Sequence, residues 1–174
     1  MLLDGDEWRR RFTEINREAW RLETLPQYLM PHEVEEFAAF REGRPPTPRA
    51  TSAYTERVAR QRAEGKRNGR VHIVTQPLSE YLQFEFARYY KAHAQAGDDI
   101  RILDVTDRPN PLERVQDFWI FDRAEVALMN YEADGRQINR EVFEGDVSPF
   151  IEYQRIAVTE SVPFEEYVNG GHRA

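Results

Sequence analysis

The chain has 174 residues, of which 40% are hydrophobic and 12% aromatic, and this size and composition are typical of one globular domain. It carries 24 basic and 31 acidic residues, a net charge of −7 at pH 7, so its surface as a whole does not suit nucleic acid. Because it has no cysteine and no apolar run long enough to span a membrane, disulfides, thiolate metal sites and a cysteine nucleophile are excluded and we expect a cytoplasmic protein.

The first part of the chain is predicted to be helical. A helix is predicted over residues 7–20, because apolar side chains recur there at spacings of three and four. These side chains are Trp8, Phe12, Ile15 and Ala19. A second helix is predicted over 32–41, before a proline-rich stretch at 44–48 that cannot continue it. The proline-rich stretch is the best candidate for a boundary in the chain.

The middle of the chain predicts a parallel βαβ unit. A helix over 52–64 precedes a short β-branched strand at 71–74. A long helix follows over 80–95, and a second strand is predicted at 100–103. A strand, a crossover helix and another strand form a right-handed unit with parallel strands.

The last third of the chain predicts antiparallel strands and two short helices. Strands are expected at 118–121, 126–131 and 138–143, and an Asp-Gly turn joins the last two as a hairpin. Helices are expected at 148–158 and 164–168.

The predicted fold class is α/β. We expect a mixed central sheet of about five strands flanked by helices, with an N-terminal helical section. Residues 1–48 form the helical section and residues 49–174 the α/β core, and together they are expected to be one compact domain.

The motifs of several enzyme classes are missing. The four histidines stand apart without metal-ligand spacing, and the chain has no phosphate loop, dinucleotide fingerprint or nucleophile elbow. The histidines are His32, His72, His93 and His172. We therefore expect no metal ion and no cofactor, and favour a protein without enzymatic activity.

Two acidic residues flank an apolar strand. Asp117 and Asp122 stand at the two ends of the strand predicted at 118–121. They could form an acid–base pair, but hydrogen bonds to local backbone amides are the simpler role. The wider set of acids around the strand ends could bind magnesium or form a solvated acidic face. This set is Asp98, Asp99, Asp104, Asp107, Asp117 and Asp122.

A basic segment stands out in this acidic chain. Residues 57–70 hold six basic side chains and one glutamate, a net charge of +5. The segment is either a surface for phosphates or an acidic partner, or a solvated helix that pairs with the chain's own acids. The candidate binding residues are Arg57, Arg60, Lys66 and Arg67.

The helix over 80–95 is rich in aromatic residues that cannot all share one helical stripe. Its core face is expected to be Leu82, Phe86 and Tyr89, whereas Tyr81, Phe84 and Glu85 face a second layer or a groove. If Glu85 is buried it needs a cationic partner, and Arg88 or Arg101 is expected to be that partner.

Several strings, taken in order, resemble an actinobacterial family of uncharacterised domains. They are Ala19-Trp20-Arg21-Leu22-Glu23-Thr24-Leu25 with Tyr28, Glu64-Gly65-Lys66-Arg67 before Arg70-Val71, Pro77-Leu78-Ser79-Glu80-Tyr81-Leu82-Gln83-Phe84-Glu85, Ala96-Gly97-Asp98-Asp99-Ile100-Arg101, and Asp117-Phe118-Trp119-Ile120-Phe121-Asp122. The genes of that family commonly lie beside helix-turn-helix regulators. The resemblance implies a cytoplasmic bacterial protein that acts with such a regulator.

The second half of the chain also resembles, distantly, half of a phospholipase D-like domain. That fold's enzymes use a His-x-Lys motif, whereas His72 is followed by Ile73 and Val74 and His93 by Ala94 and Gln95. The phosphodiesterase mechanism is therefore not expected here.

These observations predict a partner or ligand-sensing module of a bacterial regulatory system. Its expected partners are a helix-turn-helix regulator and a small-molecule ligand. The candidate binding residues are Arg70, Tyr81, Glu85, Arg101, Asp117, Trp119 and Asp122. Two alternatives stay open: an enzyme of unrecognised mechanism acting on a small phosphorylated or cationic metabolite, and nucleic-acid binding through residues 57–70.

Overall fold

The computed structural model describes residues 1–46 and 52–170 and shows a seven-stranded mixed sheet. The strand order across the sheet is β6-β5-β4-β1-β2-β3-β7. The strands are β1 (Glu18–Glu23), β2 (Arg67–Val74), β3 (Asp99–Asp104), β4 (Phe118–Phe121), β5 (Glu125–Tyr131), β6 (Gln137–Val142) and β7 (Val162–Pro163). The helices are α1 (Gly5–Thr13), α2 (Val34–Arg41) after the 3-10 turn η1 (Pro31–Glu33), α3 (Ser52–Ala63), α4 (Glu80–Glu85), α5 (Lys91–Ala96), α6 (Ser148–Glu160) and α7 (Phe164–Asn169).

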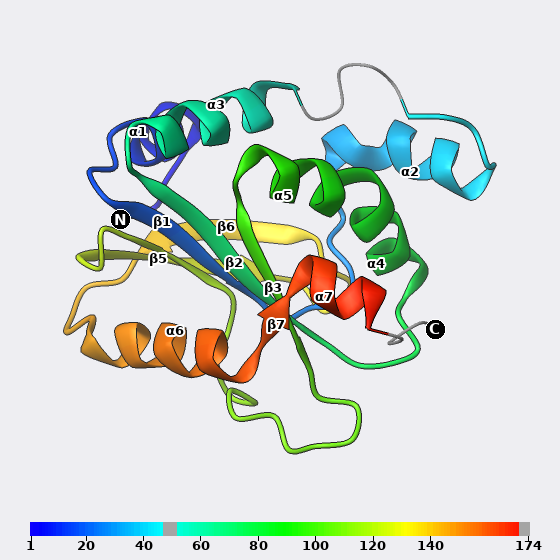
Figure 1. Ribbon diagram of the computed structural model, residues 1–174. Helices are drawn as coiled ribbons and strands as arrows, with labels where there is room; N and C mark the ends of the chain where they lie inside the picture. The colour runs from blue at the N-terminus through cyan, green and yellow to red at the C-terminus, as the bar shows by residue number, and fades with distance from the viewer. Residues whose placement is uncertain (47–51, 171–174) are drawn as a thin grey trace.

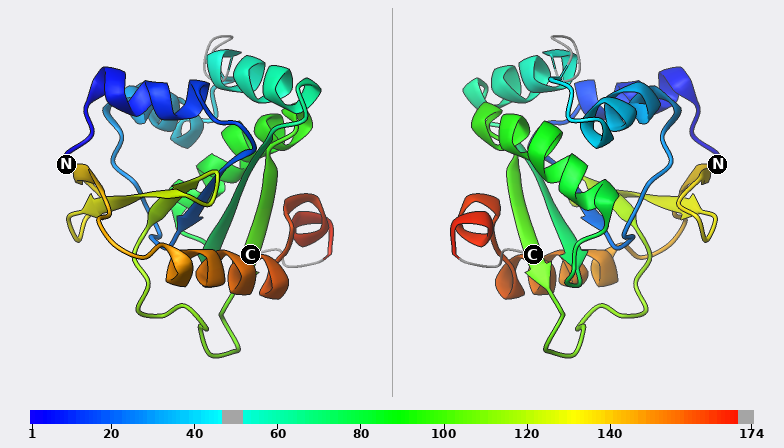
Figure 2. Two further views of the ribbon diagram at one scale, coloured as in Figure 1. Left: turned by 90° about the vertical axis from the view of Figure 1, so that its left-hand side faces the viewer. Right: turned by 90° about the vertical axis from the view of Figure 1, so that its right-hand side faces the viewer.

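The helices form two layers around the sheet. Helices α1, α3, α4 and α5 cover one face, with α2 beside α4, and α6 covers the other face (Figures 1 and 2). We call these the upper face and the lower face. Helix α7 follows the edge strand β7 and packs against the helix that contains α4 and α5, through Phe164 and Phe86.

The predicted βαβ unit is confirmed. Strands β2 and β3 are parallel, and the crossover helix between them starts at Ser79, whose hydroxyl accepts a hydrogen bond from the Leu82 amide at 3.1 Å. The helix stops at Gly97, which has φ +111°, a conformation that suits glycine. The antiparallel strands, the hairpin at Gly135 and the two C-terminal helices are also found near their predicted positions.

The N-terminal prediction is wrong in one respect. Helix α1 ends at Thr13, and the residues predicted to continue it form β1, which lies in the middle of the sheet. Arg21 and Glu23 interrupt the apolar pattern of this strand, which hides it from a periodicity argument. With β1 and the two-residue β7, the sheet has seven strands rather than about five.

The predicted loop at 44–48 lies partly outside the described residues. Within the described ranges, no helix is long and apolar enough to cross a membrane.

The two faces of the sheet differ in polarity. On the lower face the strands present apolar side chains to α6. They include Trp20, Leu22, Val71, Ile73, Phe118 and Ile120. On the upper face, one apolar cluster lies under α1 and another under α4 and α7, and a band of charged side chains separates them. Because a folded chain rarely buries charge without a reason, this band is the first candidate for a functional site.

The aromatic helix contains a π-helical turn in its middle. Residues 86–90 form this turn, η2 (Phe86–Tyr90), between α4 and α5. A π turn has a longer period than an α turn and realigns the side chains that follow it. The predicted core face of Leu82, Phe86 and Tyr89 is confirmed, but seven side chains of the helix are buried in all. They are Tyr81, Leu82, Phe84, Glu85, Phe86, Tyr89 and Tyr90.

Candidate functional site

Four charged or titratable side chains form a buried patch on the two central parallel strands. Arg21 and Glu23 project from β1, and Arg70 and His72 from β2, all toward the upper face. The strand register places Arg21 beside Arg70 and Glu23 beside His72. We call these four residues the polar band.

A cavity of about 450 Å³ lies over the polar band. Its floor is the sheet, and its walls come from α1, α3, α4, α5 and the chain between β1 and η1. The lining residues used below are Trp8, Phe12, Tyr28, Tyr54, Arg57, Tyr81, Glu85, His93, Trp119, Tyr131 and Arg140, together with Arg21, Glu23 and Arg70 of the polar band. We call it the band cavity. Pockets of this size hold small organic molecules.

Arg70 is the centre of a buried ion-pair network. Its guanidinium lies 2.9 Å from a Glu23 carboxylate oxygen and 3.2 Å from Asp98, and it donates to the Tyr54 hydroxyl at 2.7 Å. Burial raises the pKa of Glu23, but Arg21 and Arg70 lower it by more, to about 2. The Glu23 carboxylate is therefore ionised at every physiological pH.

Arg21 joins the polar band to Asp117. Its guanidinium lies 3.9 Å from Glu23 and 3.9 Å from Asp117, and it stacks over the Tyr28 and Trp119 rings. Tyr28 also donates a hydrogen bond to Asp117. The two arginines of the band are thus held flat and in fixed positions by rings and carboxylates.

His72 is completely buried and has a fixed ring orientation. Its Nε2 lies 2.9 Å from the Leu25 carbonyl, which can only accept, so Nε2 carries a proton. Its Nδ1 faces the Tyr90 hydroxyl at 2.8 Å and Glu85 at 3.3 Å. Burial lowers the pKa of His72, but Glu85 and Glu23 raise it by more, so the net shift is upward.

Two carboxyl groups share the hydroxyl of Tyr81. Its oxygen lies 2.8 Å from Glu33 and 3.1 Å from Glu85, but a phenol has a single proton to donate. The two contacts are both satisfied when Glu33 is protonated and donates to Tyr81, which donates to Glu85. Burial and the Glu85 charge raise the pKa of Glu33 to about 7, in agreement with this arrangement.

Two further arginines line the cavity and form no ion pair within the described residues. Arg57 stacks over Phe12 at 4.7 Å and Tyr54 at 5.0 Å, and Arg140 stacks over Trp8 at 4.7 Å. Arg57 Nε and Arg140 Nη1 are buried and make no hydrogen bond within the part of the chain that the structure describes. Burial lowers the pKa of both guanidinium groups, which means that the fold itself disfavours their charge.

The structure brings together some of the residues predicted from the sequence. Arg70, Tyr81, Glu85 and Trp119 all line the band cavity. Asp117 lies at its margin, where it contacts Arg21 and Tyr28.

The expected pairing of Glu85 with Arg101 or Arg88 is wrong. Arg101 points to the lower side of β3 and donates to Ser161, at 3.0 Å to the hydroxyl and 2.9 Å to the carbonyl. Arg88 donates to the Arg44 carbonyl. Glu85 lies instead on the upper face with Tyr81 and His72. Strand alternation separates Arg101 from Glu85, because neighbouring residues of β3 face opposite sides of the sheet.

Asp122 directly follows β4 and lies outside the cavity, beside the backbone that leads into β1. Its carboxylate accepts hydrogen bonds from the backbone amides of Asn16, Arg17 and Glu18, at 2.7 to 2.9 Å. We expect Asp122→Ala to lower the free energy of unfolding by about 2 kcal/mol, because it removes the acceptor of three amides. Urea unfolding measures this effect, and Asp146→Ala, at an exposed turn with one such amide contact, is the control. Equal losses for the two variants would contradict the role given to Asp122.

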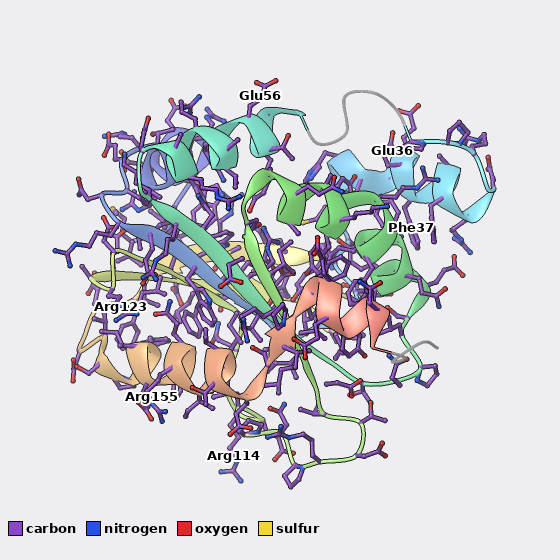
Figure 3. All side chains as sticks on the ribbon, viewed as in Figure 1. Glu36, Phe37, Glu56, Arg114, Arg123 and Arg155 are labelled. Atoms are coloured by element: carbon purple, nitrogen blue, oxygen red, sulfur yellow. The ribbon has the colours of Figure 1, made fainter. Side chains whose placement is uncertain are left out.

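The basic segment does not form one surface. Arg57 turns into the band cavity, whereas Arg60 is exposed. Lys66 and Arg67 line a second cavity, of about 650 Å³, but contact Glu64 and Glu18. Of the other arginines that line it, Arg123 lies 3.0 Å from Glu18 and Arg155 2.5 Å from Glu152, and Figure 3 shows both near α6, away from α3. Four of the five basic residues that line it, Lys66, Arg67, Arg123 and Arg155, thus already have acidic partners, so the second cavity is the weaker site.

Sequence reasoning did not find Arg21, Glu23 and His72 as site residues. The signal was present, because Arg21-Leu22-Glu23 and Arg70-Val71-His72 both alternate a charged or titratable residue with an apolar one. Two such segments on neighbouring strands place their polar side chains on one face.

The comparison with known families shows the family to which the chain belongs. Residues 6–169 match the family described as a domain of unknown function, DUF6879. The chain belongs to this family. No curated protein was found to be similar. Membership therefore agrees with the predicted kinship to an uncharacterised family, and the geometry of the site has to carry the functional argument.

Proposed function

We propose that this chain is a ligand-sensing module that binds a small organic anion with an aromatic portion in the band cavity. The observation that carries the proposal is the pair Arg57 and Arg140. Each is a partly buried cation at the cavity, stacked on a ring and without a carboxylate partner among the described residues. An anion between them would stabilise both charges.

The lining favours an anion over a cation. Five arginines line the cavity against two glutamates. They are Arg9, Arg21, Arg57, Arg70 and Arg140, with Glu23 and Glu85. When a guanidinium stacks on a ring, its edge stays available for the paired N–H donors that recognise a carboxylate or a phosphate.

The same lining favours a ligand with a flat apolar part. Trp8, Phe12, Tyr54, Trp119 and Tyr131 place aromatic surface around the cavity. Aromatic ligands gain stabilisation from edge and offset contacts with such rings. An aromatic carboxylate or an aromatic phosphate satisfies both requirements.

A sensing module of this kind acts through a protein partner that distinguishes its ligand-bound form from its free form. The resemblance to actinobacterial domains whose genes lie beside helix-turn-helix regulators supports a regulator of that type as the partner. Co-expression with a helix-turn-helix regulator whose gene adjoins that of this chain, followed by size-exclusion chromatography, tests this part. A one-to-one complex supports it, and separate elution with and without ligand contradicts it.

A second candidate is an enzyme that acts on the same ligand. Glu33 has a pKa of about 7 and shares a proton with Tyr81 beside the cavity, which is the property of a general acid or base at neutral pH. Turnover of a bound anion that Glu33→Gln abolishes would favour this candidate over sensing alone.

The binding test uses matched anionic and neutral probes. Trp8 and Trp119 line the cavity, so tryptophan fluorescence reports an aromatic ligand there. We expect saturable quenching by phenyl phosphate and benzoate, and at least tenfold weaker binding of phenol and benzyl alcohol. Trp20 packs on the lower face, so Trp20→Phe is expected to leave the quenching in place.

Arg57→Met with Arg140→Met should separate binding from stability. We expect affinity for both anions to fall at least tenfold, and the free energy of unfolding to change by less than about 1 kcal/mol, because each variant removes a buried charge that has no acidic partner. Arg155→Met, at an exposed site on α6, is the control for both measurements. Unchanged affinity in the double variant would overturn the proposal.

A further inference from the structure

We infer that Glu23, His72 and Glu85 bind one divalent first-row transition metal ion at the floor of the band cavity. Each side chain offers one ligand atom, and these atoms lie within 4.8 Å of one another. All three residues are buried. The inference does not depend on the anionic ligand proposed above.

The three ligand atoms are oriented by partners on their far sides. His72 commits Nε2 to the Leu25 carbonyl at 2.9 Å, which leaves Nδ1 facing the Tyr90 hydroxyl at 2.8 Å and the two carboxylates at 3.3 and 3.8 Å. One carboxylate oxygen of Glu23 contacts Arg70 at 2.9 Å. The other lies 3.8 Å from His72 Nδ1 and is available as a ligand. Protein metal sites hold their ligands in this way, because an outer hydrogen bond fixes the direction of the inner lone pair.

Glu85 gives the strongest indication. Its Oε2 contacts the Tyr81 hydroxyl, whereas Oε1 is buried and has no hydrogen bond within the described residues. This oxygen lies 3.3 Å from His72 Nδ1. A buried carboxylate oxygen without a donor is costly, and a cation at this point would remove that cost.

A metal ion accounts for the geometry better than a proton on His72. A proton on Nδ1 points along one direction, and the atom nearest to it is the Tyr90 oxygen at 2.8 Å. That proton cannot also serve Glu85 and the free oxygen of Glu23. A metal ion accepts a lone pair from all three atoms at once, and the Tyr90 hydroxyl can then donate to Glu23, from which it lies 3.3 Å.

The ligand set indicates the class of metal. One imidazole nitrogen with two carboxylate oxygens suits Zn²⁺, Mn²⁺ or Fe²⁺. Mg²⁺ and Ca²⁺ prefer oxygen ligands alone, so they should bind much more weakly. Three protein ligands also leave coordination positions for water or another ligand.

The experiment uses the untagged full-length chain after dialysis against a chelator. Isothermal titration with ZnCl₂ and MnCl₂ is expected to show one ion per chain, with at least tenfold weaker binding of MgCl₂. Glu85→Gln keeps the size of the side chain but loses its charge, and should weaken Zn²⁺ and Mn²⁺ binding at least tenfold. Glu80→Gln, at an exposed position on the same helix, should leave it unchanged.

A measurement on the unmodified chain covers the case in which Glu85→Gln does not fold. In NMR spectra of the imidazole groups, substoichiometric Mn²⁺ should broaden the His72 signals before those of the exposed His32. Broadening of His32 first, the absence of binding at millimolar metal, or equal affinity in Glu85→Gln would overturn the inference. Because these readouts contain no organic anion, failure here leaves the proposed ligand binding to be judged by its own test.

Discussion

Arg70→Met is expected to lower the free energy of unfolding by about 3–5 kcal/mol, the largest effect of any single change in the polar band. Arg70 is almost completely buried and contacts both Glu23 and Asp98, which are themselves buried. Removing the cation leaves two carboxylates with little compensation, and this costs more than the ion pairs gain over an apolar replacement. Chemical denaturation of the two proteins measures the difference.

The control for this prediction is on the same strand. Arg67 contacts Glu18 at 3.2 Å, but its side chain is 73% exposed, so Arg67→Met is expected to cost less than about 1 kcal/mol. Adding Glu23→Gln to Arg70→Met should recover part of the lost stability, because one stranded charge disappears. A loss from Arg70→Met no larger than that from Arg67→Met would show that the band is not a coupled network.

Glu33 predicts a pH dependence of stability. Its pKa rises from 4.5 in the unfolded chain to about 7 in the fold, chiefly through burial and the Glu85 charge. Tyr81, Glu85, Glu23, Arg21 and His32 are the titratable groups around it. Between these two pKa values the folded chain binds a proton that the unfolded chain has lost. The contribution of Glu33 to the free energy of unfolding is therefore fully present below pH 4.5 and is lost as the pH rises to 7. The fall amounts to about 3 kcal/mol.

The matched variant for this prediction is Glu33→Gln. It can donate to Tyr81 as the protonated acid does, but it does not titrate. As the pH rises from 4.5 to 8, the free energy of unfolding of the native chain should therefore fall relative to that of Glu33→Gln. A constant difference over this interval would mean that Glu33 is ionised in the fold, and the shared-proton arrangement with Tyr81 would be wrong.

Much of the fold follows from local sequence patterns. Strands β2 to β6 have apolar or alternating sequences. Gly97 and Gly135 stand where a helix ends and a hairpin turns, at positions that require a positive φ. The long helix and its core face of Leu82, Phe86 and Tyr89 were predicted correctly, but no periodicity rule anticipates the π turn at 86–90, where Tyr90 is buried as well. The two-residue strand β7 is too short to leave a pattern.

Strand β1 was missed for a different reason. Its residues Arg21 and Glu23 face the cavity, and their charge conflicts with the pattern of a buried strand. Natural chains depart from local sequence rules mainly at functional or strained positions, so the departure of β1 from the pattern of a buried strand is itself a sign of the site. The pairing across strands, Arg21 with Arg70 and Glu23 with His72, required the parallel register that only the structure provides.

The central claim is that the arginines lining the band cavity recognise an anion, and NMR of the arginine side chains tests it most directly. Phenyl phosphate is titrated into the ¹⁵N-labelled chain while the Nε–H signals are followed, with phenol as the neutral control. We predict saturable shifts for Arg21, Arg57 and Arg70, whose Nε atoms are buried and make no hydrogen bond within the described residues, and none for the exposed Arg155. The account is contradicted if these three signals stay in place, or if phenol and phenyl phosphate shift them equally.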